Sequence, residues 1–170
     1  GPIETKRKLL SSVASVWDPV GLHAYAVIPA KVLLQKVFRL GLTWDEHFPA
    51  DIQKEVNTWL HQLHTAINIA ISRMLHQDRP GRSIVRRELH FFCDASQFCF
   101  AAMAFLRAVF DDGSVDCRLV MSKNRLAPIK GSTIPRLELS GAHLAAQLAV
   151  ILRREFDLSI AAEFYWTPML

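Results

Sequence analysis

Two carboxylates stand at positions from which they could share a divalent metal ion. Asp94 follows an apolar run that ends in Phe92-Cys93, and Glu138 lies in the first turns of a predicted helix. Magnesium prefers carboxylate oxygens, and an aspartate after one strand can converge with a glutamate on a later helix. Two carboxylates alone hold metal poorly, because two-metal hydrolysis of a phosphodiester places an ion on each side of the scissile bond. These residues therefore predict an incomplete metal site.

Each carboxylate also has a plainer interpretation. Asp94 suits a turn after a strand, and a glutamate near a helix N-terminus is stabilised by the helix dipole. On helical spacing, the face that begins with Glu138 continues with Ala142, Ala145, Ala149 and Leu152. Small residues suit a helix that lies close on a sheet, and an inward glutamate is costly unless it is paired, hydrogen-bonded or bound to metal. We therefore expect Glu138 to face the sheet near Asp94.

The second half of the chain has the periodicity of strands followed by a helix. Apolar or alternating runs predict strands over residues 88–94, 99–110 and 115–122, with a hairpin turn at 111–114. A long helix over about 133–156 and a strand over 162–167 follow. This β-β-β-α-β order resembles the first portion of a ribonuclease-H-like fold, in which the fourth strand lies parallel to the first.

The first half has the periodicity of helices. Apolar positions on one face predict helices over residues 6–17, over 28–40 and from 50 onward, the last with Ile67 and Ile71 on its apolar side. Three such helices can form a small bundle. The chain is therefore predicted to combine helical and α/β parts.

Turn formers and charges at residues 77–83 separate the two halves. We therefore expect an α+β or α/β chain with a helical region over residues 3–78, a linker over 79–87 and a ribonuclease-H-like region over 88–170.

The chain is modestly basic, with a formal net charge of +4 and a pI of about 9.2. The arginines near the boundary are Arg79, Arg82, Arg86 and Arg87. Such a cluster can neutralise phosphates of a nucleic acid, although a solvated surface is the more usual explanation. Three cysteines without a C-x-x-C spacing indicate neither disulfides nor structural zinc. No apolar run approaches the ~20 residues of a membrane helix, so we expect an intracellular protein of the nucleus or cytoplasm.

Several blocks resemble, in one order, the polyprotein of BEL/Pao-type retrotransposons, in the region often labelled Pao retrotransposon peptidase. The blocks are residues 5–22, 30–35, 41–45 and 122–128, together with Phe92-Cys93-Asp94-Ala95-Ser96, Thr133-Ile134-Pro135-Arg136-Leu137-Glu138-Leu139 and Tyr165-Trp166-Thr167. The resemblance implies the helical thumb or connection of a reverse transcriptase, followed by a ribonuclease-H-like domain. Peptidase activity is not expected, because Asp94-Ala95-Ser96 lacks the glycine of an aspartic protease motif.

The family pattern continues Trp-Thr-Asp-Ser, whereas Trp166-Thr167 is followed here by Pro168. A proline side chain cannot bind metal, and another acid of the family would lie beyond Leu170. The resemblance therefore implies a vestigial site of Asp94 and Glu138, with no catalysis, no metal and no other cofactor.

The expected function is that of a domesticated, retrotransposon-derived module that binds another protein or a second copy of itself. The predicted contact residues are Phe164, Tyr165, Trp166, Met169 and Leu170, because aromatic residues and methionine are enriched at interfaces and an uncovered edge strand invites pairing. The alternative is a nucleic-acid-binding domain, or a magnesium-dependent nuclease for RNA–DNA hybrids that uses acids supplied elsewhere.

Overall fold

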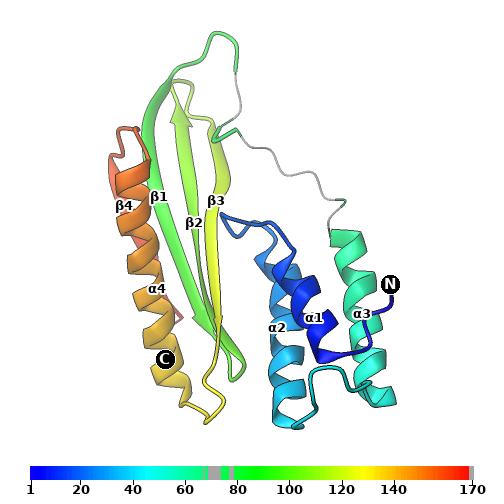
Figure 1. Ribbon diagram of the computed structural model, residues 1–170. Coiled ribbons are helices and arrows are strands. Elements are labelled where there is room, and N and C mark those ends of the chain that lie inside the picture. Colours follow the sequence, from blue (N-terminus) through cyan, green and yellow to red (C-terminus); the bar gives the residue numbers. More distant parts are fainter. Residues whose placement is uncertain (67, 69–73, 77–78, 169–170) are drawn as a thin grey trace. The chain divides into compact units, whose positions relative to one another are not determined.

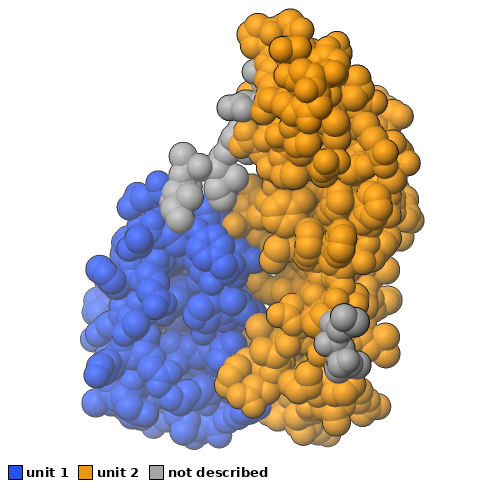
Figure 2. Space-filling model, turned by 180° about the vertical axis from the view of Figure 1, so that it is seen from behind, with its two compact units in different colours: residues 1–19, 23–70 blue, residues 20–22, 71–170 orange. Residues whose placement is uncertain are grey.

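The computed structural model describes residues 1–66, 68, 74–76 and 79–168. The helices are α1 (Lys6–Ala14), α2 (Ala24–Arg39), α3 (Ala50–Ala66) and α4 (Ile134–Glu155), and the strands are β1 (Ile84–Ala95), β2 (Cys99–Phe110), β3 (Val115–Leu126) and β4 (Ala162–Trp166) (Figure 1). The chain divides into two compact units, residues 1–19 with 23–70 and residues 20–22 with 71–170 (Figure 2). No described helix is long and apolar enough to cross a membrane.

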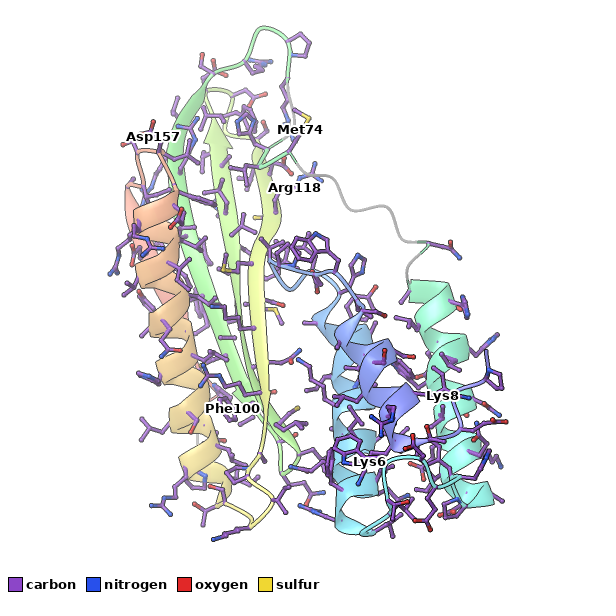
Figure 3. All side chains as sticks on the ribbon, viewed as in Figure 1. Lys6, Lys8, Met74, Phe100, Arg118 and Asp157 are labelled. Carbon is purple, nitrogen blue, oxygen red and sulfur yellow. The ribbon has the colours of Figure 1, made fainter. Side chains whose placement is uncertain are left out.

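The first unit is a bundle of α1, α2 and α3, as the helical periodicity predicts. Its core is formed by buried apolar residues of all three helices: Leu9, Val13, Leu33, Val37, Ile52, Val56 and Trp59. The Trp59 indole N–H donates to the carbonyl of Ala26 at 2.9 Å, so the bulky ring is buried without an unpaired donor. Lys6, labelled in Figure 3, is also buried, with its ammonium over the rings of Phe38 (4.7 Å) and Trp44 (4.8 Å).

Two helix boundaries differ from the prediction. The first helix ends at Ala14 rather than at residue 17, and Trp17 is 86% exposed. Pro19 disfavours helical geometry at the residue before it. The second helix begins at Ala24, four residues before the predicted start, so that Pro29 lies inside it. The predicted apolar positions Ile67 and Ile71 lie outside the described residues.

The second unit is a four-stranded sheet with α4, and it has the predicted β-β-β-α-β order. The strand order is β3-β2-β1-β4, with β1 and β2 antiparallel, β2 and β3 antiparallel, and β4 parallel to β1. Helix α4 contacts β1 and β2. Buried residues of the sheet and of α4 form the core of this unit, and Phe100 of β2, labelled in Figure 3, packs against that core. The architecture is therefore a helical bundle followed by an α+β, ribonuclease-H-like unit.

Strand β1 begins at Ile84, so the last part of the predicted linker is strand. The extra residues pair with the end of β2, where Ile84 lies opposite Phe110. The turn between β2 and β3 is closed by Gly113 at a φ of 79°, a left-handed conformation that glycine adopts without strain. Asp112 accepts hydrogen bonds from the Ser114 hydroxyl and amide, and these bonds hold the pKa of its carboxyl below the usual value.

The face that α4 turns toward the sheet differs by one residue from the predicted face. Its buried residues are Leu137, Gly141, Leu144, Ala145, Leu148, Ala149 and Leu152. Glu138 and Ala142 are half-buried, at the margin of this face. The shift centres the contact on Gly141, where an added Cβ would lie 3.4 Å from the Asp94 carbonyl oxygen and 3.6 Å from Cys93 Cβ. These are ordinary van der Waals distances, so the helix lies close to the sheet here and still leaves room for a methyl group.

We expect Gly141→Ala to raise the free energy of unfolding by about 0.5–1 kcal/mol, because alanine favours a helix interior more than glycine does and the new methyl group would meet ordinary van der Waals distances. Urea unfolding of both chains measures the difference. Gly141→Leu is the size control and should destabilise the domain, because overpacking forces the helix away from the sheet. A destabilising alanine would show that α4 lies closer to β1 than these distances indicate.

Candidate functional site

Asp94 and Glu138 approach the same end of the sheet from different elements. Asp94 is the penultimate residue of β1, is exposed, and accepts a hydrogen bond from the Ala95 amide at 2.7 Å. Glu138 lies one turn before Gly141 on α4. Because Gly141 contacts the backbone of Asp94, the first turns of α4 lie near the end of β1. Among the described residues, no hydrogen bond or ion pair joins the two carboxylates.

Pro168 lies two residues after the end of β4, near the end of β1 that carries Asp94. The parallel register of β1 and β4 ends with Phe92 opposite Trp166, and Asp94 and Pro168 each follow two residues later. These two residues line one cavity of about 360 Å³, together with Phe92, Met103, Trp166 and Thr167. Glu138 is not among the lining residues. The position at which the family resemblance predicts a third carboxylate therefore lies in the same cavity as Asp94, and it holds a proline.

The donor set at this position does not fit a resident magnesium ion. The described part of the chain contains no group of three or more His, Cys, Asp or Glu side chains that could hold a metal ion. Asp94 and Glu138 supply carboxylate oxygens, which magnesium prefers. However, Asp94 alternates with Cys93 of the core, so its side chain projects from the face of β1 away from α4, the helix that carries Glu138. The two carboxylates therefore do not form one set of ligands.

The four predicted phosphate-contacting arginines do not form one patch. Arg86 and Arg87 are neighbours in β1, so their side chains leave opposite faces of the sheet. Arg79, Arg82 and Arg87 line one cavity of about 400 Å³. Arg86 instead forms an ion pair with Glu88, with Nε 2.7 Å from Oε1. The structure thus brings three of the four together and separates the fourth.

Glu88 forms a buried charge network that sequence reasoning missed. Its side chain is 7% exposed, accepts a hydrogen bond from Arg107 at 2.7 Å and forms an ion pair with Arg86 at 2.7 Å. The His90 ring lies 3.3 Å from the same carboxylate. Burial opposes ionisation of Glu88, yet the hydrogen bonds from Arg107 and His90 and the charge of Arg86 together lower the pKa of this carboxyl. The alternation of Arg86, Glu88 and His90 along one strand was the only available sequence signal.

The sheet carries large apolar side chains on the face away from α4. Leu89, Phe91 and Cys93 belong to the core with α4, so the alternating residues of β1 project from the opposite face. On that face, Phe92, Met103, Phe164 and Trp166 are each between 38% and 50% exposed. We call this the aromatic face, and it consists of His90, Phe92, Met103, Phe105, Phe164 and Trp166.

Stacked rings organise the aromatic face. The His90 ring stacks with Phe164 (centroids 4.8 Å apart) and with Trp166 (6.2 Å). Phe92 stacks with Trp166 at 6.0 Å. Beside these rings lies an apolar cavity of about 460 Å³, lined by His90, Phe92, Met103, Phe105, Arg107 and Cys117.

The predicted partner-binding residues of β4 lie on two different faces of the sheet. Phe164 and Trp166 contribute to the aromatic face. Tyr165 alternates with them, stacks on Phe91, and hydrogen-bonds Glu163 (2.9 Å). Burial and the hydrogen bond to Glu163 raise the pKa of Tyr165. Met169 and Leu170 lie outside the described residues.

Comparison with known proteins gives one match. The family model described as Pao retrotransposon-like RNaseH-like domain matches residues 5–168. No curated protein and no solved structure matches the chain.

Proposed function

Because the chain belongs to the family of Pao retrotransposon-like RNaseH-like domains, we propose that it is a non-catalytic, domesticated member that binds a protein partner through the aromatic face and the edge of β4. The observation that carries this proposal is the exposure of large apolar side chains on three adjacent strands, β2, β1 and β4. Exposed apolar patches of this kind mark interaction surfaces. Pro168 supports the non-catalytic part, because it stands where the resemblance to the family predicts a third acid after Trp166-Thr167.

The partner contact that fits best is a strand added to β4. In the described sheet β4 is the last strand, paired with β1 alone, so its other edge offers backbone groups for a further strand. Strand addition obtains affinity from main-chain hydrogen bonds and specificity from side chains on alternate positions. Phe164 and Trp166 alternate on the aromatic face. The partner is therefore an extended segment with apolar residues at alternate positions.

A photo-reactive phenylalanine analogue at position 164 tests this surface in cells. The control replaces Leu139, which is also apolar and 71% exposed but lies on α4. We expect cross-links to a different protein from position 164 and none to that protein from position 139. Cross-links between two copies of this chain would overturn the proposed partner in favour of a homodimer.

The cross-linked partner is then purified and its affinity measured with defined variants. Trp166→Ala should weaken binding by about 30-fold, because interfacial tryptophans commonly contribute about 2 kcal/mol or more. Leu139→Ala should leave affinity unchanged. Equal affinities for the parent chain and Trp166→Ala would move the interface away from the aromatic face.

A further inference from the structure

A basic cavity lies at the start of β1, at the end of the strand opposite to Asp94. It has a volume of about 400 Å³, and its lining includes His76, Arg79, Arg82, Arg87 and Phe110. All of these residues belong to the second compact unit. We call it the arginine cavity. Arg87 alternates with Arg86 in β1, so its side chain projects from the face of the sheet opposite to the aromatic face. The arginine cavity shares no lining residue with the cavity of the aromatic face, so it is separate from the protein-binding site proposed above.

Arg79 is held in place by an aromatic ring and a neutral hydroxyl. Its guanidinium lies over the Phe110 ring, with Cζ 4.6 Å from the ring centroid. One Nη donates to the Ser114 hydroxyl at 2.6 Å. Stacking on the ring and a bond to a neutral acceptor orient the planar guanidinium but do not neutralise its positive charge. This arrangement presents a positioned cation to the cavity.

Arg82 is different, because acidic side chains of the hairpin turn already pair with it. Its Nε lies 3.3 Å from Asp112 and its Nη1 lies 3.9 Å from Asp111. These pairs are partly exposed. Asp112 also interacts with the charge of Arg79, but no ion pair joins the two side chains among the described residues. Arg79 and Arg87 are therefore the arginines of the cavity that have no direct acidic partner in the described part of the chain.

Two nitrogen atoms of the cavity-lining side chains are buried and lack a partner. Arg87 Nε and His76 Nδ1 are shielded from solvent, and neither has a hydrogen-bond partner among the described residues. A buried donor without an acceptor is costly, more so when it carries charge. Both atoms belong to residues that line the same cavity as Arg79. An anionic acceptor bound there would satisfy the Arg87 Nε–H, and it would also satisfy His76 Nδ1 in the tautomer that carries the proton on this nitrogen.

We propose that the arginine cavity binds a phosphate group through Arg79, Arg87 and His76, either a phosphate of a nucleic-acid strand or that of a small phosphate compound. A guanidinium presents donors in a planar fork that matches phosphate oxygens. Two guanidinium groups and an imidazole from separate parts of the chain suit an acceptor with oxygens pointing in several directions. The cavity is larger than one phosphate group, which leaves room for the rest of the ligand.

The test uses the whole chain in a buffer free of phosphate and sulfate, with inorganic pyrophosphate and a short single-stranded oligonucleotide as probes. Nuclear magnetic resonance of arginine Nε–H groups follows Arg87 directly, and calorimetry gives the affinities. We expect a saturable shift of the Arg87 Nε–H signal. Arg87→Gln should weaken binding about tenfold or more, as expected for the loss of a charge-assisted hydrogen bond.

Arg154→Gln is the matched control. It removes the same charge from an exposed site on α4, where Arg154 pairs only with Glu155 in the described chain. The control should retain the parent affinity. Equal weakening by both variants would reduce the effect to overall charge and overturn the site. Arg79→Gln should repeat the loss, and it provides the test if Arg87→Gln does not fold.

Thermal unfolding without ligand separates binding from structure. Arg87→Gln should not lower the melting temperature, because it removes a buried donor that has no partner in the described chain. A marked fall would assign Arg87 a structural role and overturn the proposal.

Competition between the two probes identifies the source of the phosphate. If the oligonucleotide displaces pyrophosphate at concentrations far below that of pyrophosphate, the ligand is a nucleic-acid strand. If the two probes compete at comparable concentrations, the ligand is a small phosphate compound. Absence of binding by both probes would reject the site.

Discussion

Replacement of Glu88 by glutamine should lower the free energy of unfolding by about 2 kcal/mol. The carboxylate is 7% exposed, accepts a hydrogen bond from Arg107 and forms an ion pair with Arg86. Removing one partner of a buried charge network leaves the remaining charges without compensation, which costs about 3–5 kcal/mol when every member is buried. Here Arg86 and Arg107 are 51% and 34% exposed, so water partly compensates them. Urea unfolding at neutral pH measures the change.

The same network predicts a specific dependence on pH. The pKa of Glu88 is lowered in the folded state from its ordinary value of 4.5. A group with a lowered folded pKa binds protons more readily when the chain is unfolded, so its stabilising contribution is present above about pH 4.5 and is lost as the pH falls through the folded pKa. Unfolding free energies of the parent and Glu88→Gln should therefore converge below pH 4.5.

Glu155→Gln is the control for this experiment, because Glu155 pairs with Arg154 at an exposed site. Its effect should stay within about 0.5 kcal/mol, as for most surface ion pairs. If Glu88→Gln is equally mild, or if its difference from the parent does not diminish in acid, the carboxylate contributes little to stability and the network is a surface feature.

The succession of strands along the chain was predictable, because the local sequence of most strands shows where they lie. Residues 99–110 form an apolar run with Arg107 as its one charged residue, and Asp111-Asp112-Gly113-Ser114 supplies turn formers directly after it. The structure places β2 over the predicted range. The start of β1 was not predictable in the same way. It begins Ile84-Val85-Arg86-Arg87, a short apolar pair followed by two charges. These residues become strand by pairing with the end of β2, a long-range interaction that no local pattern contains.

Helical spacing alone also did not predict which residues of α4 pack on the sheet. Small residues at 142, 145 and 149 suggested one face. The buried face includes Ala145 and Ala149 but takes in Leu137 and Gly141 in place of residues 138 and 142, a difference that arises from contact with the sheet. Glu88 was overlooked for a related reason. Its main partner, Arg107, is 19 residues away in sequence, and only the antiparallel register brings the two opposite each other.

The chain should not cleave an RNA–DNA hybrid with magnesium or manganese, even at high protein concentration. Two-metal phosphodiester hydrolysis needs carboxylates that hold both ions, and the described residues near this end of the sheet supply Asp94 and Glu138 alone. A labelled hybrid, with an active ribonuclease H as the positive control, provides the assay. Cleavage that disappears in Asp94→Asn would overturn the non-catalytic proposal and favour the nuclease alternative.

Pro168→Asp tests the reason for the missing activity rather than the absence itself. The register that pairs Phe92 with Trp166 predicts that an aspartate at 168 would lie beside Asp94, and a third carboxylate should strengthen manganese binding by about tenfold, the equivalent of ~1.4 kcal/mol. Val150→Asp is the matched control: it adds the same charge at an exposed position near the other end of α4, away from Glu138. Line broadening of the Asp94 and Glu138 signals by manganese reports both variants. If Val150→Asp gains as much as Pro168→Asp, added charge explains the binding. A gain confined to Pro168→Asp would identify this proline as the substitution that removed the third ligand, since the other two carboxylates are unchanged.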